Sequence, residues 1–135
     1  MLTKSLAYRI YWTGRYLERI ENICRISIIA VNNGSSLDSI AKGYGLKGEK
    51  ELFEYVRMSL ELLRENIRSF ANEKLMIEVN EMESRINSPK DNLVSYFSDI
   101  ISSAMRLGNS LEGYFNERIY NLRMRSQQEN QPEPK

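Results

Sequence analysis

Apolar residues recur at steps of three and four over the first segment of the chain, which places them on one stripe of a helix. This pattern predicts one long helix over about residues 3–32. The Asn33-Gly34 pair that follows is typical of a left-handed helix stop. The members of the stripe are Leu6, Ile10, Thr13, Leu17, Ile20, Cys24, Ile28 and Val31.

The same helical spacing continues through the rest of the chain, interrupted by capping residues. Ser36 can cap a short helix over residues 37–42, and a second long helix starts near Glu49, with Leu52, Val56, Leu60, Leu63, Ile67 and Phe70 on its stripe. Asn72 is a further N-cap candidate, for a helix that reaches about residue 87. Ser88-Pro89 has the serine of an N-cap and the proline of a first helical position, and it predicts the start of the last helix. The apolar residues of that helix are Leu93, Phe97, Ile100, Ala104, Leu107 and Leu111.

No alternating strand pattern appears in the sequence, so we expect an all-α fold. The predicted elements fit an up-and-down bundle of about four to five helices, forming a single domain over residues 1–125. Gly108 and Gly113 are candidates to bend or end the last helix, and the basic stretch 118–125 either continues it or frays. The polar segment 126–135 has no apolar anchor, and we expect it to be a disordered tail.

Composition excludes several kinds of chemistry. The chain has no histidine, which removes Ser-His-Asp and Cys-His catalysis and the common zinc sites, and a single cysteine cannot form an internal disulfide. Glu-x-x-Glu pairs occur, but such pairs are usually a solvated helix face, so we predict no metal, no cofactor and no catalytic residue. No apolar run is long enough to be a signal peptide or to span a membrane, so we expect a cytoplasmic protein with a reduced Cys24.

Charge does not favour a general attraction to nucleic acid or to anionic membranes. The chain has 19 basic and 18 acidic side chains, a net charge of +1. Arg118, Arg123 and Arg125, with their neighbouring aromatic residues, could bind RNA, but this balance favours a helix end that faces a partner or a dimer mate.

The first predicted helix has a second face, nearly opposite its apolar stripe. One interpretation is that Arg15 and Arg25 pair with Glu61 and Glu65 of the second long helix and tie the bundle together. The other is a polar pocket or partner surface, because arginine suits bidentate contacts with carboxylate or phosphate. The residues of this face are Tyr8, Tyr11, Arg15, Glu18, Asn22 and Arg25, with Trp12 and Arg19 beside them.

Residues 6–25 follow an ordered pattern: an aromatic-Trp pair, then Gly-Arg-aromatic-x-Glu-Arg-x-Glu-Asn, then Arg. This segment resembles the alpha-E domain family, an α-helical domain with an Arg/Glu signature, and residues 63–68 resemble a second segment of that family. The resemblance marks as signature positions Gly14, Arg15, Glu18, Arg19, Glu21, Asn22 and Arg25, and as a second set Arg64, Glu65 and Asn66.

The resemblance implies a non-enzymatic helical interaction or accessory module. The family has no established reaction, and its members look like companions of ATP-grasp-type peptide ligases and transglutaminase-like proteases. The alternative is a ligand-binding or catalytic subunit, in which Arg15, Arg19 and Arg25 hold a carboxylate or phosphate and Glu18 or Glu65 handles a proton. The family domain is about twice this long, so this chain is either a minimal version or one of two copies that associate; we expect a homodimer.

Overall fold

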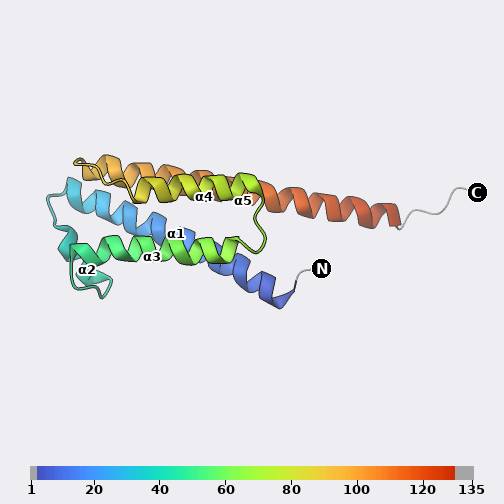
Figure 1. Ribbon diagram of the computed structural model, residues 1–135, viewed down its shortest axis with the longest axis horizontal. Helices are drawn as coiled ribbons and strands as arrows, with labels where there is room; N and C mark the ends of the chain where they lie inside the picture. Colours follow the sequence, from blue (N-terminus) through green and yellow to red (C-terminus); the bar gives the residue numbers. More distant parts are fainter. Residues whose placement is uncertain (1–2, 130–135) are drawn as a thin grey trace, which may run out of the picture.

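The computed structural model describes residues 3–129, and this part of the chain is built from helices joined by short connections (Figure 1). The predicted all-α fold is therefore confirmed. In chain order the helices are α1 (Lys4–Asn32), α2 (Leu37–Gly43), α3 (Glu49–Ile67), α4 (Glu73–Ile86) and α5 (Leu93–Glu129). Within residues 3–129, no helix combines the length and the apolar character that a membrane crossing needs.

The four longer helices lie side by side and form the expected up-and-down bundle (Figure 1). α1 is the central element, because it packs against both α3 and α5, while α4 packs mainly on α5. The short α2 connects α1 to α3 at one end of the bundle. At the other end α1 and α5 run past the α3–α4 connection and diverge, so their ends lack the neighbours that cover them elsewhere (Figure 1).

One continuous hydrophobic core fills the space between the helices. Burial of these side chains is the main favourable contribution to folding, at roughly 1.5–3 kcal/mol for a fully buried large aliphatic or aromatic side chain. Tyr96 is also buried, and its hydroxyl donates a hydrogen bond to the carbonyl oxygen of Ile86, 2.6 Å away, so its polar atom is satisfied. The largest fully buried side chains include Ile20, Ile23, Leu52, Leu63, Ile67, Leu75, Met82, Ile86, Phe97, Ile100 and Leu107.

Three helix starts and one helix stop are where the sequence predicts them. The side chains of Thr3, Ser36 and Asn72 each accept a hydrogen bond from the backbone N–H three residues later, which satisfies one free donor of the first turn. Gly34, just after α1, has a φ of 73°, a conformation that glycine adopts without the strain of a side chain. These local signals set the length of α1 and the entry into α2 and α4.

The start of α5 differs from the prediction. Ser88 and Pro89 belong to the connection, and α5 begins at Leu93, after Asn92, whose Oδ1 atom accepts a hydrogen bond from Ser95 N at 3.1 Å. The predicted start at Ser88 is wrong because α4 runs almost to that residue, and the chain needs a reversing connection before α5 can pack antiparallel to α4. Asparagine caps a helix as well as serine does, so Asn92 can take the place predicted for Ser88.

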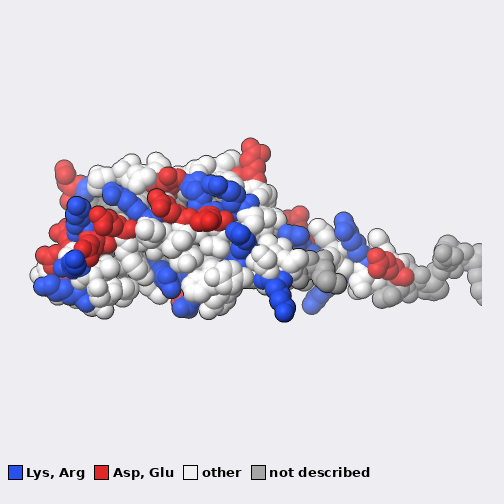
Figure 2. All heavy atoms as spheres, turned by 60° about the horizontal axis from the view of Figure 1, so that its bottom comes forward, with Lys and Arg blue, Asp and Glu red and all other residues white. Residues whose placement is uncertain are grey.

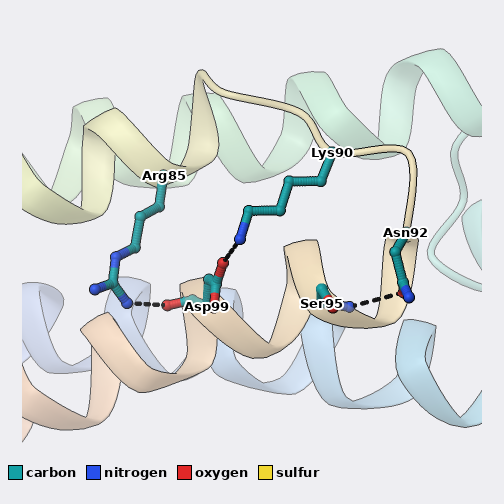
Figure 3. A network of polar contacts seen from close by, with 5 residues as sticks. All are labelled: Arg85, Lys90, Asn92, Ser95 and Asp99. Atoms are coloured by element: carbon teal, nitrogen blue, oxygen red, sulfur yellow. Dashed lines mark hydrogen bonds and ion pairs between the residues drawn. The ribbon is translucent and has the colours of Figure 1, made fainter.

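This connection is fastened to the side of α5. Figure 3 shows Arg85 and Lys90 both reaching Asp99: the Arg85 guanidinium donates to the Asp99 backbone oxygen at 2.9 Å, and Lys90 forms an ion pair with the carboxylate. The two contacts hold the end of α4 and the start of the connection against the second turn of α5. They explain how an exposed, polar segment keeps a defined path.

α5 continues well beyond the bundle. It is helical through Gly108 and Gly113 and through residues 126–129, which belong to the segment expected to be a disordered tail. Extending an existing helix needs no new nucleation, and the Arg, Met, Gln and Glu residues of this stretch favour helix, so α5 passes the predicted boundary at residue 125. The rest of the expected tail, residues 130–135, lies outside the described residues.

Candidate functional site

The Arg/Glu signature lies on the solvent side of α1. The helical turn of about 100° per residue places it opposite the buried side, which is made of Thr13, Leu17, Ile20, Ile23, Cys24, Ser27 and Ala30. Glu21 lies at the edge of the exposed side and is half-buried, and Gly14 has open space around it. We call the exposed side the signature face; its residues are Tyr8, Tyr11, Trp12, Arg15, Tyr16, Glu18, Arg19, Asn22 and Arg25.

Two arginines of the signature face pair with glutamates of their own helix. Arg15 Nη1 lies 3.6 Å from Glu18 Oε2, and Arg25 Nη2 lies 3.8 Å from Glu21 Oε2. The interpretation that Arg15 and Arg25 pair with Glu61 and Glu65 of the second long helix is therefore wrong. The physical reason is rotation: α3 packs on the buried side of α1, whereas these arginines point away from it. Such exposed pairs stabilise a helix by only about 0.2–1 kcal/mol, so they do not explain why arginines are gathered here.

An aromatic cluster occupies the first half of the signature face. The ring of Trp12 lies 6.1 Å from that of Tyr8, 5.4 Å from that of Tyr11 and 5.5 Å from that of Tyr16, measured between centroids. The guanidinium carbon of Arg19 stacks over two of these rings, 5.6 Å from the centroid of Trp12 and 5.2 Å from that of Tyr16. The cluster is thus held in place by contacts within one rigid helix.

Much of this aromatic surface remains open to solvent. Tyr8 is 63% exposed and Tyr11 is 58% exposed. Tyrosine, tryptophan and arginine are the residue types that contribute most to binding energy at protein–protein interfaces. The signature face therefore has the composition of a docking surface and the rigidity that keeps the entropic cost of binding low.

The second set of candidate residues lies on α3 and has a different role. The Arg64 guanidinium donates to Asn80 Oδ1 at 2.8 Å and forms an ion pair with Glu83, so it links α3 to α4. Asn66 donates from its side chain to the carbonyl oxygen of Leu62 at 2.7 Å, and Glu65 is exposed. The contacts of Arg64 are made with α4, whereas the pairs and stacks of the signature face lie within α1, so these contacts do not join the two sets.

The described residues offer little for covalent or metal chemistry. Across residues 3–129, no group of three His, Cys, Asp or Glu side chains is arranged to hold a metal ion. Cys24 is fully buried, and burial, helped by the negative charge of Glu21, raises the pKa of its thiol to about 12. A thiol that stays protonated is a poor nucleophile, so Cys24 acts as part of the core.

The periodicity of the sequence did not reveal two further features. Glu78 is almost completely buried between α4 and α5, where one carboxylate oxygen accepts a hydrogen bond from Ser110 Oγ at 2.8 Å. A groove of about 590 Å³ opens between the start of α1 and the far half of α5. In the sequence, this groove is indicated only by the apolar residues that continue along α5 past Leu111. We call it the open-end groove; it is lined by Leu6, Ile10, Phe115, Arg118, Ile119, Asn121, Leu122 and Arg125.

The fold and this face define a small all-α domain with an Arg/Glu motif on its first helix. A family model, Alpha-E, described as a predicted alpha-helical domain with a conserved ER motif, matches residues 1–74, more than half of the chain. This chain therefore belongs to the Alpha-E family. The matched region contains α1, α2 and α3, and with them both sets of candidate residues. No curated protein and no solved structure matches the chain.

Proposed function

We propose that this protein is a non-enzymatic helical interaction module that docks on a peptide-processing enzyme through its signature face. The enzyme would be an ATP-grasp-type peptide ligase or a transglutaminase-like protease, the companions that the family resemblance implies, and the complex would form in the cytoplasm. One observation carries the proposal: Tyr8 and Tyr11 stand largely exposed beside Trp12, on the side of α1 that faces away from the core.

The exposure of these side chains supports binding more than a structural role. Trp12 and Arg19 are only half-buried, and the ion pairs of Arg15 and Arg25 are local and open to water. Because the core closes on the other side of α1, removal of these groups should leave the bundle folded. A partner that covers the face would bury the apolar surface of the rings. The charged side chains that it contacts are already held in position by their neighbours.

The geometry gives less support to a ligand-binding or catalytic subunit. That function needs Arg15, Arg19 and Arg25 to converge on one small ligand. The ten helical steps from Arg15 to Arg25 extend about 15 Å along a convex helix surface, which is the shape of a contact strip rather than of an enclosed pocket. Each arginine also has a neighbour already, a glutamate for the first and last and the aromatic rings for Arg19.

Direct binding to a purified enzyme tests the proposal. The ATP-grasp ligase encoded in the same genome would be immobilised, and the affinity of the full chain would be measured by biolayer interferometry. We expect the double variant Tyr11→Ala/Arg15→Glu to bind at least about tenfold more weakly, a loss of 1.4 kcal/mol, while keeping its melting temperature.

Met58→Ala is the matched control, because Met58 is also more than half exposed but lies on α3. Equal weakening by both variants, or no binding of the wild-type chain to either the ligase or the protease, would contradict the proposal.

Homodimerisation, which the resemblance also implies, stays a prediction. Light scattering coupled to size-exclusion chromatography should give about twice the chain mass of 15.8 kDa. A monomer at micromolar concentration would contradict it, without affecting the assignment of the signature face.

A further inference from the structure

The open-end groove is a second surface, separate from the signature face. Leu6 and Ile10 form its α1 wall, and they lie on the side of α1 opposite Tyr8 and Arg15. Phe115, together with Ile119 and Leu122 farther along α5, forms the other wall. Figure 1 shows α1 and α5 diverging where they extend past the bundle.

The groove exists because two helices are longer than their neighbours. α3 ends at Ile67 and α4 begins at Glu73, so neither helix covers the last turns of α5 or the first turns of α1. Phe115 still packs on the edge of the core, against the ring of Phe70 at 5.5 Å, but Ile119 is 51% exposed and Leu122 is 60% exposed. The apolar stripe of α5 therefore runs about two turns beyond the residues that could bury it.

The charged side chains that line the groove are positive. Its charged lining residues are Arg118 and Arg125, and the guanidinium of Arg118 is held over the Tyr114 ring at 5.6 Å. Figure 2 shows several blue side chains around the place where α5 leaves the bundle, with a few red ones there and along its projecting part.

We propose that the open-end groove binds an acidic amphipathic helix of a partner protein. Apolar residues spaced three and four apart on that helix would pack on Ile10, Phe115 and Leu122, as in other helix-in-groove complexes. Glutamates or aspartates on the flanks of the helix would pair with Arg118 and Arg125, which lie about two turns apart on the same wall. The two arginines also favour fast association with such a segment and disfavour a basic one.

The two nearest alternatives fit the groove less well. A second copy that inserted its own α5 would bring Arg118 and Arg125 with the apolar stripe, because these arginines flank that stripe, and would set like charges against each other. The last six residues of the chain, Asn-Gln-Pro-Glu-Pro-Lys, have no leucine, isoleucine or aromatic side chain to fill the apolar floor. Charge and shape together therefore favour a different chain.

The test uses two synthetic helical peptides and the full-length protein. Both peptides are labelled with fluorescein and have leucines spaced three and four apart; glutamates flank the leucines in one, and lysines replace them in the other. We expect fluorescence anisotropy to show that the acidic peptide binds at least about tenfold more tightly than the basic one, with an affinity that falls as salt is added.

Variants of the chain locate the binding site. Arg118→Glu/Arg125→Glu and Leu122→Ser should each weaken the acidic peptide by about tenfold or more. Lys50→Glu/Arg57→Glu is the matched control, because it makes the same change in net charge on exposed residues of α3, away from the groove. The control should bind within about twofold of the wild-type chain, since surface charges more than a Debye length away are screened.

Several results would overturn the proposal. They are a failure of the wild-type chain to bind the acidic peptide, equal binding of the two peptides, and equal weakening by the groove variants and the control. The proposal would also fail if vesicles containing phosphatidylserine bound the protein while the acidic peptide did not. It would fail as well if the protein formed a dimer that the Leu122→Ser substitution dissociates. None of these results bears on the signature face, because the groove and that face lie on opposite sides of α1.

Discussion

The hydroxyl of Tyr114 donates a hydrogen bond to the backbone carbonyl oxygen of Phe70, with 2.8 Å between the two oxygens. Phe70 lies in the connection between α3 and α4, so this bond fastens α5 to the rest of the bundle at the place where α5 begins to project. The Phe70 ring also contacts Phe115. The residues at this junction thus support the inner end of the open-end groove.

Loss of the Tyr114 hydroxyl should destabilise the protein without changing its fold. Tyr114→Phe leaves a partly buried carbonyl oxygen without its partner, and we expect the free energy of unfolding to fall by about 1 kcal/mol in urea titrations. Tyr120→Phe serves as the control, because Tyr120 is 62% exposed on the projecting part of α5 and its hydroxyl should be hydrated in both states. A larger loss in the control than in Tyr114→Phe would contradict the assigned role.

The two candidate arginine sites should respond differently to truncation. Arg64 is half-buried and joins α3 to Asn80 and Glu83 of α4, so Arg64→Ala should lower the free energy of unfolding by about 1–2 kcal/mol. Arg15→Ala removes an exposed pair within one helix and should change it by less than about 0.5 kcal/mol. Chemical denaturation of both variants makes the comparison, and a large loss in Arg15→Ala would mean that the signature face stabilises the fold.

Asp99 should make the stability of the protein depend on pH in the acidic range. The hydrogen bond that Lys90 donates, assisted by the positive charges of Lys90 and Arg85, lowers the pKa of Asp99 below its ordinary value. The folded state therefore holds this proton less tightly than the unfolded state. The stabilisation is present above about pH 4 and is lost as the pH falls through the lower folded-state pKa.

Melting temperatures measured from neutral to acidic pH should decline less steeply for Asp99→Asn than for the wild-type chain. Asp91→Asn is the control, because Asp91 is exposed in the same connection. If the two variants lose stability on acidification in the same way, the ion pair with Lys90 is not the source of the effect.

Cys24 should react with a thiol reagent only when the protein unfolds. The thiol is fully buried and its pKa is raised to about 12, so the thiolate that attacks disulfide reagents is scarce at neutral pH. We expect modification by a colorimetric disulfide reagent to be at least about a hundredfold slower in the native protein than in denaturant. Glu21→Gln should remain nearly as unreactive, since burial is the larger cause of the shift; a fast reaction in the native state would show that α1 opens locally.

Much of the fold follows from short-range patterns in the sequence. Asn72 and Ser36 were identifiable as caps because their side chains satisfy donors only three residues away. The start of α5 was not, because Ser88 and Asn92 are both good caps and the choice depends on how far α4 extends before the chain must reverse. Tertiary packing decides which of the two residues starts α5, and a local sequence pattern contains no information on that packing.

The candidate site was predicted in part. The helical angle correctly separated the face with Tyr11 and Arg15 from the buried side, but it could not tell whether α3 would cover that face. The partners of Arg64 were also hidden, since Glu83 is 19 residues away and an ion pair between two helices depends on their relative rotation and rise. Side-chain spacing assigns residues to faces of a helix, and only the assembled bundle shows which faces meet.

Trp12 is the only tryptophan of the chain, and it stands in the aromatic cluster rather than in the core. Its indole emission therefore comes from the signature face alone, from a ring in contact with the guanidinium of Arg19. A partner that covers or displaces this contact would change the wavelength and quenching of that emission, while the core remains spectroscopically silent at tryptophan excitation. The protein thus carries an intrinsic optical reporter of whether its candidate docking surface is occupied.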